Sequence, residues 1–527
     1  MLAYTIYISF LGAAALLLLP KRATTTARIL ALLTATAAFA IALASFLTHR
    51  TGEMQTITRT PWIPSLGIEY HLAADGISVS LVLLTGIIAI TGVLFSWNVG
   101  AAAESNARVP QFFSLYLLLI GAVYGVFLSA DIFLLFVFYE IVIIPKYFLI
   151  AIWGSTRKEY GAMKLALYSF IGSALVLIGI IAAYVAAGAR TTDIATLAHF
   201  PFPHHFQMLA FPLVFVGFAI LAGLWPFHTW APTGHVAAPT AASMLLAGVV
   251  MKLGAYGCLR VAMVLFPQGL TAWSHPVLGL TSWRDTFALL AVIGIVYGAL
   301  VALVQKDFKF VIGYSSVSHM GFILLGLMTL NQLGLAGAIL QMISHGLLAG
   351  LLFAIVGRMV YARTHTREFY KLGPLNLSCT LPFAAVTFVL AGMAAMGLPG
   401  FSGFVAELMI LIGTWRTYPL FALATGFGIL IGVIYIWRAM QKAFFTDAHT
   451  STNPGAPFMT VSSSCVGSDA QQRTTELPPI TLPEKIGAII LITSSIAVGL
   501  YPQMLLNIIL PALNSPLFAP LRTGSWQ

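Results

Sequence analysis

The stretch "LAGLWPFHTWAPTGHVAAPTAASMLLAGVVMKLGAYGCLR", residues 221–260, holds two features that decide the fold. Its first half interrupts an apolar run with Pro226 and Pro232, and proline breaks a regular helix because it lacks the backbone N–H. Its second half places Lys252 inside another apolar run. Freed backbone groups and a mid-run charge both need polar surroundings that lipid does not supply. The stretch therefore predicts a helical membrane bundle with a polar interior.

The whole chain has the composition of a multi-pass membrane protein. Its 527 residues are 59% hydrophobic and 8% charged, with a mean hydropathy of +0.94, whereas about 25% of residues are charged in soluble domains. Apolar runs long enough to cross a bilayer begin near residues 3, 28, 77, 111, 131, 165, 207, 240, 286, 309, 333, 380, 418 and 485. We expect an all-α protein with about 14 transmembrane helices and no water-soluble domain.

Basic residues predict the orientation of these helices. The first apolar run has no basic region ahead of it and is followed by Lys21 and Arg22, the reverse of a cleavable signal peptide. If helices alternate from an outer N-terminus, the cytoplasmic loops collect 17 Lys and Arg against 7 on the other face. This satisfies the positive-inside rule. The formal charge of +10 is then a topological signal rather than a sign of nucleic-acid binding.

No pattern in the chain predicts a redox cofactor or a metal. Its three cysteines are scattered, and no C-x-x-C, Walker or dinucleotide-binding pattern occurs. His228 and His235 have no acidic or cysteine companions nearby in the sequence, which disfavours a metal site.

Two interrupted segments predict an internal duplication. The seventh apolar run breaks at residues 224–228, around Pro226, and the twelfth breaks at residues 397–403, around Pro399, five helices later. Matching breaks in two halves indicate inverted repeats with broken helices. Residues 445–485 are rich in Ser, Thr, Pro and Gly, which is typical of a flexible loop, and docking of a soluble partner there is the alternative. The expected regions are 1–110 (helices 1–3), 111–265 (first repeat, helices 4–8), 286–443 (second repeat, helices 9–13), 444–484 (flexible cytoplasmic loop) and 485–527 (helix 14 and tail).

Five ionisable residues stand near the middle of apolar runs: Glu140, Lys252, His319, His345 and Glu407. A charge at the bilayer centre costs roughly 2.5–3.5 kcal/mol, so each needs an explanation. Each group alone could fix helix packing through a hydrogen bond worth about 0.6–2 kcal/mol. Together they could form a hydrated row that moves protons, because histidine and a buried lysine both titrate readily.

Several runs resemble the antiporter-like membrane subunits of respiratory complex I, and the resemblance extends from helix 1 to helix 14. The runs include "FYEIVIIPKYFLIAIWG" (138–154), "WPFHTWAPTGHVAAPTAASMLLAGVVMKLGAYGCLR" (225–260), "QMISHGLLAGLLF" (341–353) and "GLPGFSGFVAELMIL" (397–411). Glu407, where sister subunits usually have Lys, makes the chain look M-type, like the mitochondrial subunit 4.

The resemblance implies a division of roles along the chain. The acid matched by Glu140 pairs with a lysine on helix 7, Lys252 passes protons to the centre, His319 and His345 continue the path, and Glu407 gates one end. It also implies that NADH, FMN, iron–sulfur clusters and quinone are held by partner subunits, and that L-, N-, K- and J-type subunits are the partners. The location would be the bacterial inner (cell) membrane, and the basic loops predict that the N-terminus lies on its periplasmic or outer side.

The chain departs from the family pattern in the first half. The family lysine before the helix-7 break aligns with Leu221, and family acids are replaced by Ile120, Thr233, Ala237 and Ala362. Lys146 could compensate by reaching back to Glu140 across a bend at Pro145, or it could extend to the cytoplasmic face. Lys164, His228 and His235 are further accessory candidates.

Three functions remain open from the sequence. The first is a proton-pumping M-type subunit of an NADH-quinone oxidoreductase. The second is a membrane subunit of a related hydrogenase or multisubunit cation/proton antiporter. The third is a structural spacer whose first half-channel does not conduct.

Overall fold

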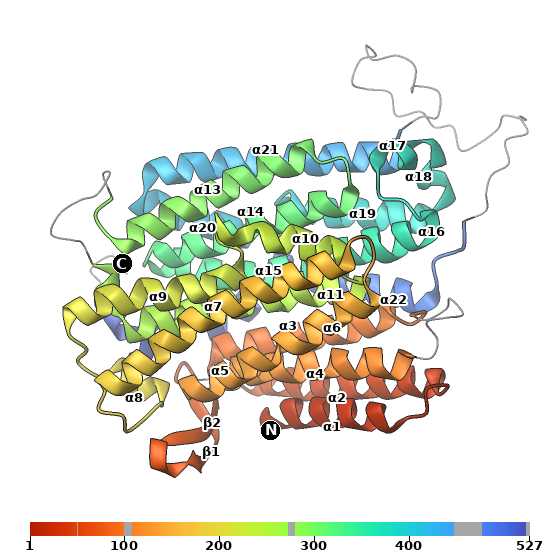
Figure 1. The fold of residues 1–527 in the computed structure, drawn as a ribbon. Coiled ribbons are helices and arrows are strands. Elements are labelled where there is room, and N and C mark those ends of the chain that lie inside the picture. Colours follow the sequence, from red (N-terminus) through yellow and green to blue (C-terminus); the bar gives the residue numbers. More distant parts are fainter. Residues whose placement is uncertain (50, 100–107, 272–279, 447–476, 523–527) are drawn as a thin grey trace, which may run out of the picture.

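A computed structural model describes residues 1–49, 51–99, 108–271, 280–446 and 477–522. Most of the longer helices run along one common direction and form a single bundle (Figure 1). The elements of the first half are α1 (Ala3–Leu18), α2 (Thr24–Thr48), β1 (Gln55–Ile63), β2 (Ile68–Ala74), α3 (Gly76–Phe95), α4 (Val109–Leu128), α5 (Ile132–Ile141), α6 (Ile143–Trp153), α7 (Lys158–Ala186), α8 (Ile194–Ala198), α9 (His204–Ala222), α10 (Trp230–Ala237), α11 (Thr240–Leu245) and α12 (Met251–Gly257).

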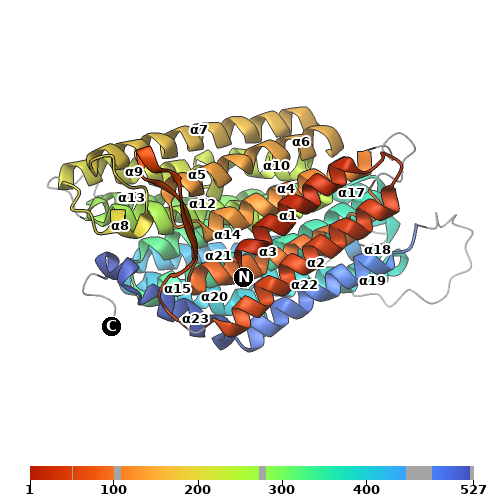
Figure 2. The same ribbon diagram turned by 90° about the horizontal axis from the view of Figure 1, so that it is seen from below.

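The second half has the same all-helical character. Its elements are α13 (Trp283–Val304), α14 (Phe308–Met328), α15 (Gln332–Ala354), α16 (Ala362–Thr364), α17 (Phe369–Leu372), α18 (Leu377–Thr380), α19 (Pro382–Ala395), α20 (Ser402–Thr417), α21 (Pro419–Phe444), α22 (Leu482–Leu500) and α23 (Gln503–Leu513). In Figure 2, α7 forms one edge of the bundle and α22 the opposite edge, with α14 and α15 between them.

The predicted fold class is confirmed. Among the described residues, 12 helical segments are long and apolar enough to cross a membrane. Helices are also present at the first and twelfth predicted runs, but they are shorter: α1 has 16 residues, and the twelfth run is divided into α19 with 14 and α20 with 16. The count of 14 spans and the two inverted repeats stay predictions.

Both predicted helix breaks are present. After α9 the chain turns at Gly223, whose φ of 83° is left-handed, and helical structure resumes in α10. Trp230 Nε1 donates to Ile220 O at 2.8 Å, which ties the first residue of α10 to the end of α9. The second break lies between α19 and α20, where Gly397 and Gly400 have φ of 70° and 96°. Glycine suits both turns because it has no Cβ to clash at positive φ.

Close helix contacts through glycine place the ionisable residues inside the bundle. A Cβ on Gly254 would lie 2.5 Å from Phe218 O, so α12 packs directly on the backbone of α9. A Cβ on Gly337 would lie 2.9 Å from Ile410 N, so α15 packs equally closely on α20. Small residues at helix contacts are the usual means of packing in membranes. These contacts fix the helices that carry Lys252, His345 and Glu407.

Two elements lie outside the sequence prediction. The strands β1 and β2 pair antiparallel as a hairpin between α2 and α3, which corrects the purely helical expectation for residues 1–110. The alternation of threonine with larger side chains in β1 was the available signal. The helix α23 lies in the segment that we expected to be a tail.

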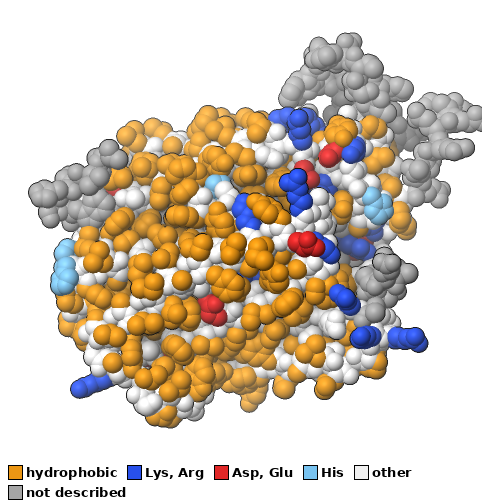
Figure 3. All heavy atoms as spheres, viewed as in Figure 1, with side chains coloured by type: hydrophobic (Ala, Val, Ile, Leu, Met, Phe, Trp, Pro, Cys, Tyr) orange, Lys and Arg blue, Asp and Glu red, His pale blue; other side chains and the backbone are white. Residues whose placement is uncertain are grey.

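Basic side chains gather at the end of the bundle that carries α17 and α18 (Figures 1 and 3). This distribution agrees with the predicted cytoplasmic loops, although the orientation in a membrane stays a prediction. Most of the predicted flexible loop, residues 447–476, lies outside the described residues.

Candidate functional site

Lys252 lies at the centre of the bundle, on the short helix α12, and has no exposed surface. π-helical segments flank α12 at Leu246–Val250 and Cys258–Met263. Such segments often occur at functional sites, where they offer backbone carbonyls that a regular helix would occupy. Lys252 Nζ donates to the carbonyl of Ala247 and lies 2.9 Å from His345 Nδ1. The ammonium is therefore held between a carbonyl and an imidazole.

His345 and His319 meet face to face. Their rings, from α15 and α14, are stacked with centroids 5.2 Å apart and an interplanar angle of 14°. His345 Nε2 is buried without a hydrogen-bond partner. His319 Nδ1 lies 2.8 Å from Ser315 O, and since a carbonyl only accepts, Nδ1 carries a proton. The stack thus links the residue beside Lys252 to a second histidine.

Glu407 ends this series of contacts. Its Oε1 lies 3.5 Å from His319 Nε2 and accepts a hydrogen bond of 3.4 Å from Gln341 Nε2. The four residues Lys252, His345, His319 and Glu407 come from four different helices and form one continuous series, which we name the central row. The structure brings together four of the five residues expected at mid-depth.

Two small cavities lie against the ring of His319. One is lined by His319 and His345 and the other by His319 and Glu407, each with a volume of about 10 Å³. A single water molecule needs about that volume. The central row has no short hydrogen bond between His345 and His319 or between His319 and Glu407. These are the two places with room for a water molecule.

His235 and Lys309 extend the central row toward the basic end. His235 is fully buried on α10, and neither ring nitrogen has a hydrogen-bond partner. It interacts electrostatically with both Lys252 and Lys309. Lys309 is 3% exposed and donates to Val236 O at 3.2 Å and to Ala238 O at 2.7 Å. His235 thus interacts both with Lys252 of the central row and with a second buried lysine.

Lys309 was not predicted as a site residue, because in the sequence it stands at the edge of an apolar run, among the Lys and Arg expected in cytoplasmic loops. A signal was present: a lysine in the first turn of α14 opposes the helix dipole, so it needs another reason to be there. Its Nζ caps the carbonyl end of α10 instead. Gln341, which contacts Glu407, carried no such signal.

Glu140 does not join the central row. Among the described residues, no hydrogen bond or ion pair connects it with Lys252, and its Oε1 is buried without a hydrogen-bond partner. Lys146 is a cation that interacts with it electrostatically. Lys146 is 1% exposed, so the alternative in which it extends to the cytoplasmic face is wrong. Its Nζ donates to Ser169 Oγ at 2.9 Å.

The helix break near Pro226 supplies polar groups but no charge. Leu221 is 3% exposed and packs in the apolar core. His228 is buried with both ring nitrogens unpartnered, and its ring lies edge-on to Tyr297 with centroids 5.1 Å apart. Lys164 on α7 interacts electrostatically with His228. Both accessory candidates therefore belong to the surroundings of the break and not to the central row.

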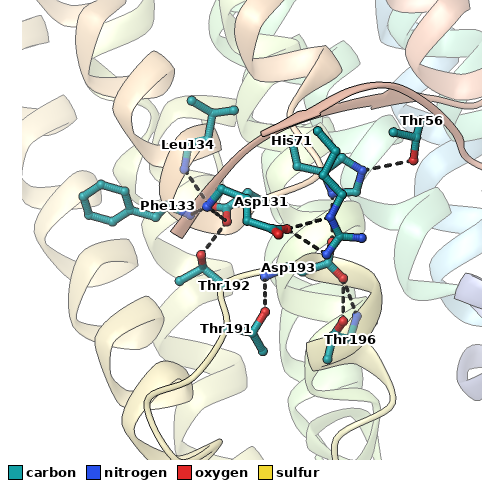
Figure 4. A network of polar contacts seen from close by, with 11 residues as sticks. Thr56, His71, Asp131, Phe133, Leu134, Thr191, Thr192, Asp193 and Thr196 are labelled. Atoms are coloured by element: carbon teal, nitrogen blue, oxygen red, sulfur yellow. Dashed lines mark hydrogen bonds and ion pairs between the residues drawn. The ribbon is translucent and has the colours of Figure 1, made fainter. Parts of the chain in front are cut away.

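The β-hairpin is anchored by a polar cluster at the starts of α5 and α8 (Figure 4). His71 Nδ1 lies 2.9 Å from Asp193 Oδ2, and His71 Nε2 lies 3.1 Å from Thr56 Oγ1. Burial opposes ionisation of Asp193, but hydrogen bonds from His71 and Thr196 lower its pKa to about 2. Burial raises the pKa of Asp131, against the hydrogen bonds that its carboxylate accepts.

This cluster includes the one group of three metal-ligating side chains found among the described residues. Ligand atoms of Glu69, His71 and Asp193 lie within 4.8 Å of one another. All three are already engaged, since Glu69 pairs with Arg59 at 2.7 Å and His71 with Asp193 and Thr56. A cation would compete with the Arg59 guanidinium for the same carboxylate. We interpret the cluster as a structural site that fixes the hairpin to the starts of α5 and α8.

Residues 129–432 match the family model described as NADH:quinone oxidoreductase/Mrp antiporter, TM. NADH-quinone oxidoreductase subunit M of Rhodobacter capsulatus is 35% identical over 473 residues, which cover 87% of this chain and 84% of that protein.

Two solved structures contain chains of similar fold. One chain of respiratory complex I from Thermus thermophilus with bound NADH has a TM-score of 0.83 at 25% identity, and the match covers 99% of this chain and 100% of that chain. One chain of the Mrp complex from Dietzia sp. has a TM-score of 0.80 at 22% identity, covering 99% of both. The second likeness concerns the fold alone.

Proposed function

The chain is an M-type member of the NADH:quinone oxidoreductase/Mrp antiporter family of membrane subunits, and we propose that its central row carries protons. The observation that supports the proposal is the unbroken series Lys252, His345, His319 and Glu407 inside the bundle. Each of these four side chains can gain and lose a proton, whereas the apolar side chains around them cannot.

In the proposed first step, a proton passes from Lys252 to His345. If the Lys252 ammonium donates to His345 Nδ1, the neutral imidazole carries its own proton on Nε2. Transfer of a proton from Lys252 to Nδ1 then frees the Nε2 proton to leave toward His319, and the lysine becomes a neutral amine. No electron moves in this step.

The second step ends on Glu407. His319 Nδ1 is protonated because it faces a carbonyl, so Nε2 is the atom that exchanges a proton with Glu407 Oε1, 3.5 Å away. A proton on Nε2 gives an imidazolium beside a carboxylate, and a proton on Oε1 gives two neutral groups. Gln341 stabilises the carboxylate through its amide. Glu407 is thus the exit or entry group of the row.

The complex supplies the energy for this movement. The chain is a multi-pass membrane protein of a bacterial-type complex I, so other membrane subunits are its partners. We propose that these partners are L-, N-, K- and J-type subunits. We also propose that partner subunits hold NADH, FMN, iron–sulfur clusters and quinone. We also propose that the chain lies in the bacterial inner (cell) membrane, with its N-terminus on the periplasmic or outer side.

The substitution Glu407→Gln in the assembled complex tests the proposal. An amide cannot exchange the proton, so we expect transfer through the row to slow by roughly 100-fold or more. Proton uptake into vesicles per NADH oxidised should fall. Glu368→Gln, an exposed acid at the basic end, serves as the matched control. Unchanged pumping by Glu407→Gln would leave a structural spacer as the function of this chain.

A second candidate, the spacer with a non-conducting first half, is favoured by two observations. Leu221 gives the helix break no charge, and no ion pair within 4.0 Å balances Glu140 among the described residues. The genes beside this one address the remaining alternative, because nickel–iron hydrogenase or antiporter subunits there would indicate a related machine.

A further inference from the structure

Lys146 is a buried ammonium that the central row does not use. It lies on α6, inside the span Ile132–Trp153, and is 1% exposed. Among the described residues, its hydrogen bond goes to a neutral hydroxyl, Ser169 Oγ, at 2.9 Å. A lysine in such a place costs free energy unless another charge or a proton exchange compensates. Its four-carbon side chain could have turned to the surface, as lysines near helix ends do, so its inward position needs a cause.

Glu140 supplies the opposite charge. The two residues interact electrostatically, although no ion pair within 4.0 Å joins them. They are six positions apart, which puts them on different faces of a regular helix. Here the helix is interrupted at Val142, between α5 and α6, and Pro145 removes a further backbone hydrogen bond. The interruption allows both side chains to face α7.

Two hydroxyls of α7 stand opposite these two groups. Ser169 and Ser173 are four residues apart and therefore share one helix face. Ser169 accepts from Lys146, whereas Ser173 interacts with Glu140. Glu140 Oε1 and Ser173 Oγ are both buried, and neither makes a hydrogen bond of regular geometry. Unpartnered buried polar atoms are rare in native proteins. Glu140, Ser173, Ser169 and Lys146 together form a polar line, which we name the α7 strip.

No other cation can serve Glu140 from the helix break. Residues 204–251, which include α9, α10 and the break between them, contain no Lys, Arg, Asp or Glu. Of the two lysines on α7, Lys158 donates to Ile152 O at 3.0 Å and Lys164 interacts with His228. Within the described residues, the charge that balances Glu140 therefore comes from α6.

We propose that Lys146 and Glu140 exchange a proton along the α7 strip, so that this pair is a second proton site of the chain, separate from the central row. One proton leaves the Lys146 ammonium and one reaches the Glu140 carboxylate, which gives a neutral amine and a neutral acid. The reverse step restores both charges. Ser169 positions Nζ. The proposal rests on the proposed function, because it assigns the pair to the same proton movement.

Two substitutions of Lys146 test this assignment in the whole complex. Lys146→Met removes the charge and keeps an unbranched apolar chain. Lys146→Arg keeps a positive charge that cannot be released as a proton. We expect both variants to lower proton pumping per NADH oxidised by roughly 10-fold or more. Lys371→Met, an exposed lysine on α17, is the control for the same chemical change.

Infrared spectroscopy supplies a readout that a structural role would not move. A carboxylic-acid band that appears during turnover and disappears in Glu140→Gln identifies protonation of Glu140. We expect this band to be lost in Lys146→Arg. If Lys146→Met fails to assemble, Lys146→Arg decides alone, because it keeps the charge. Normal pumping and a normal band in Lys146→Arg would overturn the proposal.

The two proposals fail in different ways. If Glu407→Gln abolishes pumping and the Lys146 variants pump normally, the second proton site is wrong and the central row stands. If Glu407→Gln pumps normally, the proposed function is wrong, whatever the Lys146 variants do to the infrared band.

Discussion

The hydrogen bond between Lys252 and His345 limits the charges that these two residues can carry at once. At 2.9 Å, one atom must donate and the other accept. A doubly charged pair, ammonium against imidazolium, would have no acceptor and would place two like charges together in a buried site. One proton beyond the neutral pair therefore belongs to both residues. Such sharing makes the pair suited to pass a proton on to His319.

The substitution His345→Phe separates this role from packing. Phenylalanine keeps a ring against His319, where the imidazoles stack at 5.2 Å, but it removes both nitrogens. We expect proton transfer through the row to fall by roughly 100-fold, and the melting temperature of the subunit to fall because Lys252 loses an acceptor, at a cost of about 1–3 kcal/mol. Pumping assays and thermal unfolding measure the two effects. An exposed control, His199→Phe, should change neither, and normal pumping by His345→Phe would contradict the role.

At the scale of helices and turns, the break between α19 and α20 sets the position of Glu407. The chain passes through Gly397 and Gly400, both at positive φ, before α20 begins at Ser402. Glu407 lies just over one turn into α20, so its carboxylate points back toward the break. A Cβ on Gly397 would lie 2.9 Å from Glu407 Oε2, whereas a Cβ on Gly400 would meet nothing within 4 Å. The two glycines therefore share a backbone demand but differ in what they touch.

The pair Gly397→Ala and Gly400→Ala uses this difference. Each variant should lose stability, by about 1 kcal/mol or more, because alanine disfavours positive φ. Only Gly397→Ala should push the carboxylate away from its position 3.5 Å from His319. We expect reduced proton pumping in Gly397→Ala and near-normal pumping in Gly400→Ala at the same amount of assembled complex. Equal losses in both variants would show that strain in the turn, and not contact with Glu407, explains the effect.

At the scale of the whole molecule, hydropathy and helix breaks could be predicted because both follow from local sequence. Proline and glycine at the two breaks, and a charged residue amid apolar ones, are visible without knowledge of neighbours. Which helices meet was not visible. Lys309 looked like a loop charge until α14 was placed against the end of α10. From the sequence, Lys146 could reach back toward Glu140 or extend to the cytoplasmic face, and its contact with α7 excludes the second position.

The position of the last long helix depends on one buried acid. Glu484, at the start of α22, is 1% exposed and accepts from Arg358 Nε at 2.7 Å and from Arg363 Nη2 at 2.6 Å. These contacts join α22 to the end of the helical segment Gln332–Thr364, which begins with α15 and carries His345 near its middle. Farther along, Ser402 links the two sides, since its Oγ lies 2.8 Å from Ser344 Oγ and 3.0 Å from Ser495 Oγ. The acid therefore holds α22 against the helices of the central row.

The substitution Glu484→Gln should loosen this arrangement throughout the bundle. It leaves two arginines near one neutral amide, and breaking a buried ion pair from one side typically costs about 3–5 kcal/mol. We expect a lower melting temperature and faster hydrogen exchange along α22, with weaker proton pumping per assembled complex because α15 and α20 lose their support. Glu368→Gln, which breaks an exposed pair with Lys371, should cost less than about 1 kcal/mol. If Glu484→Gln lowers the melting temperature while pumping per complex stays normal, α22 stabilises the bundle without positioning the central row.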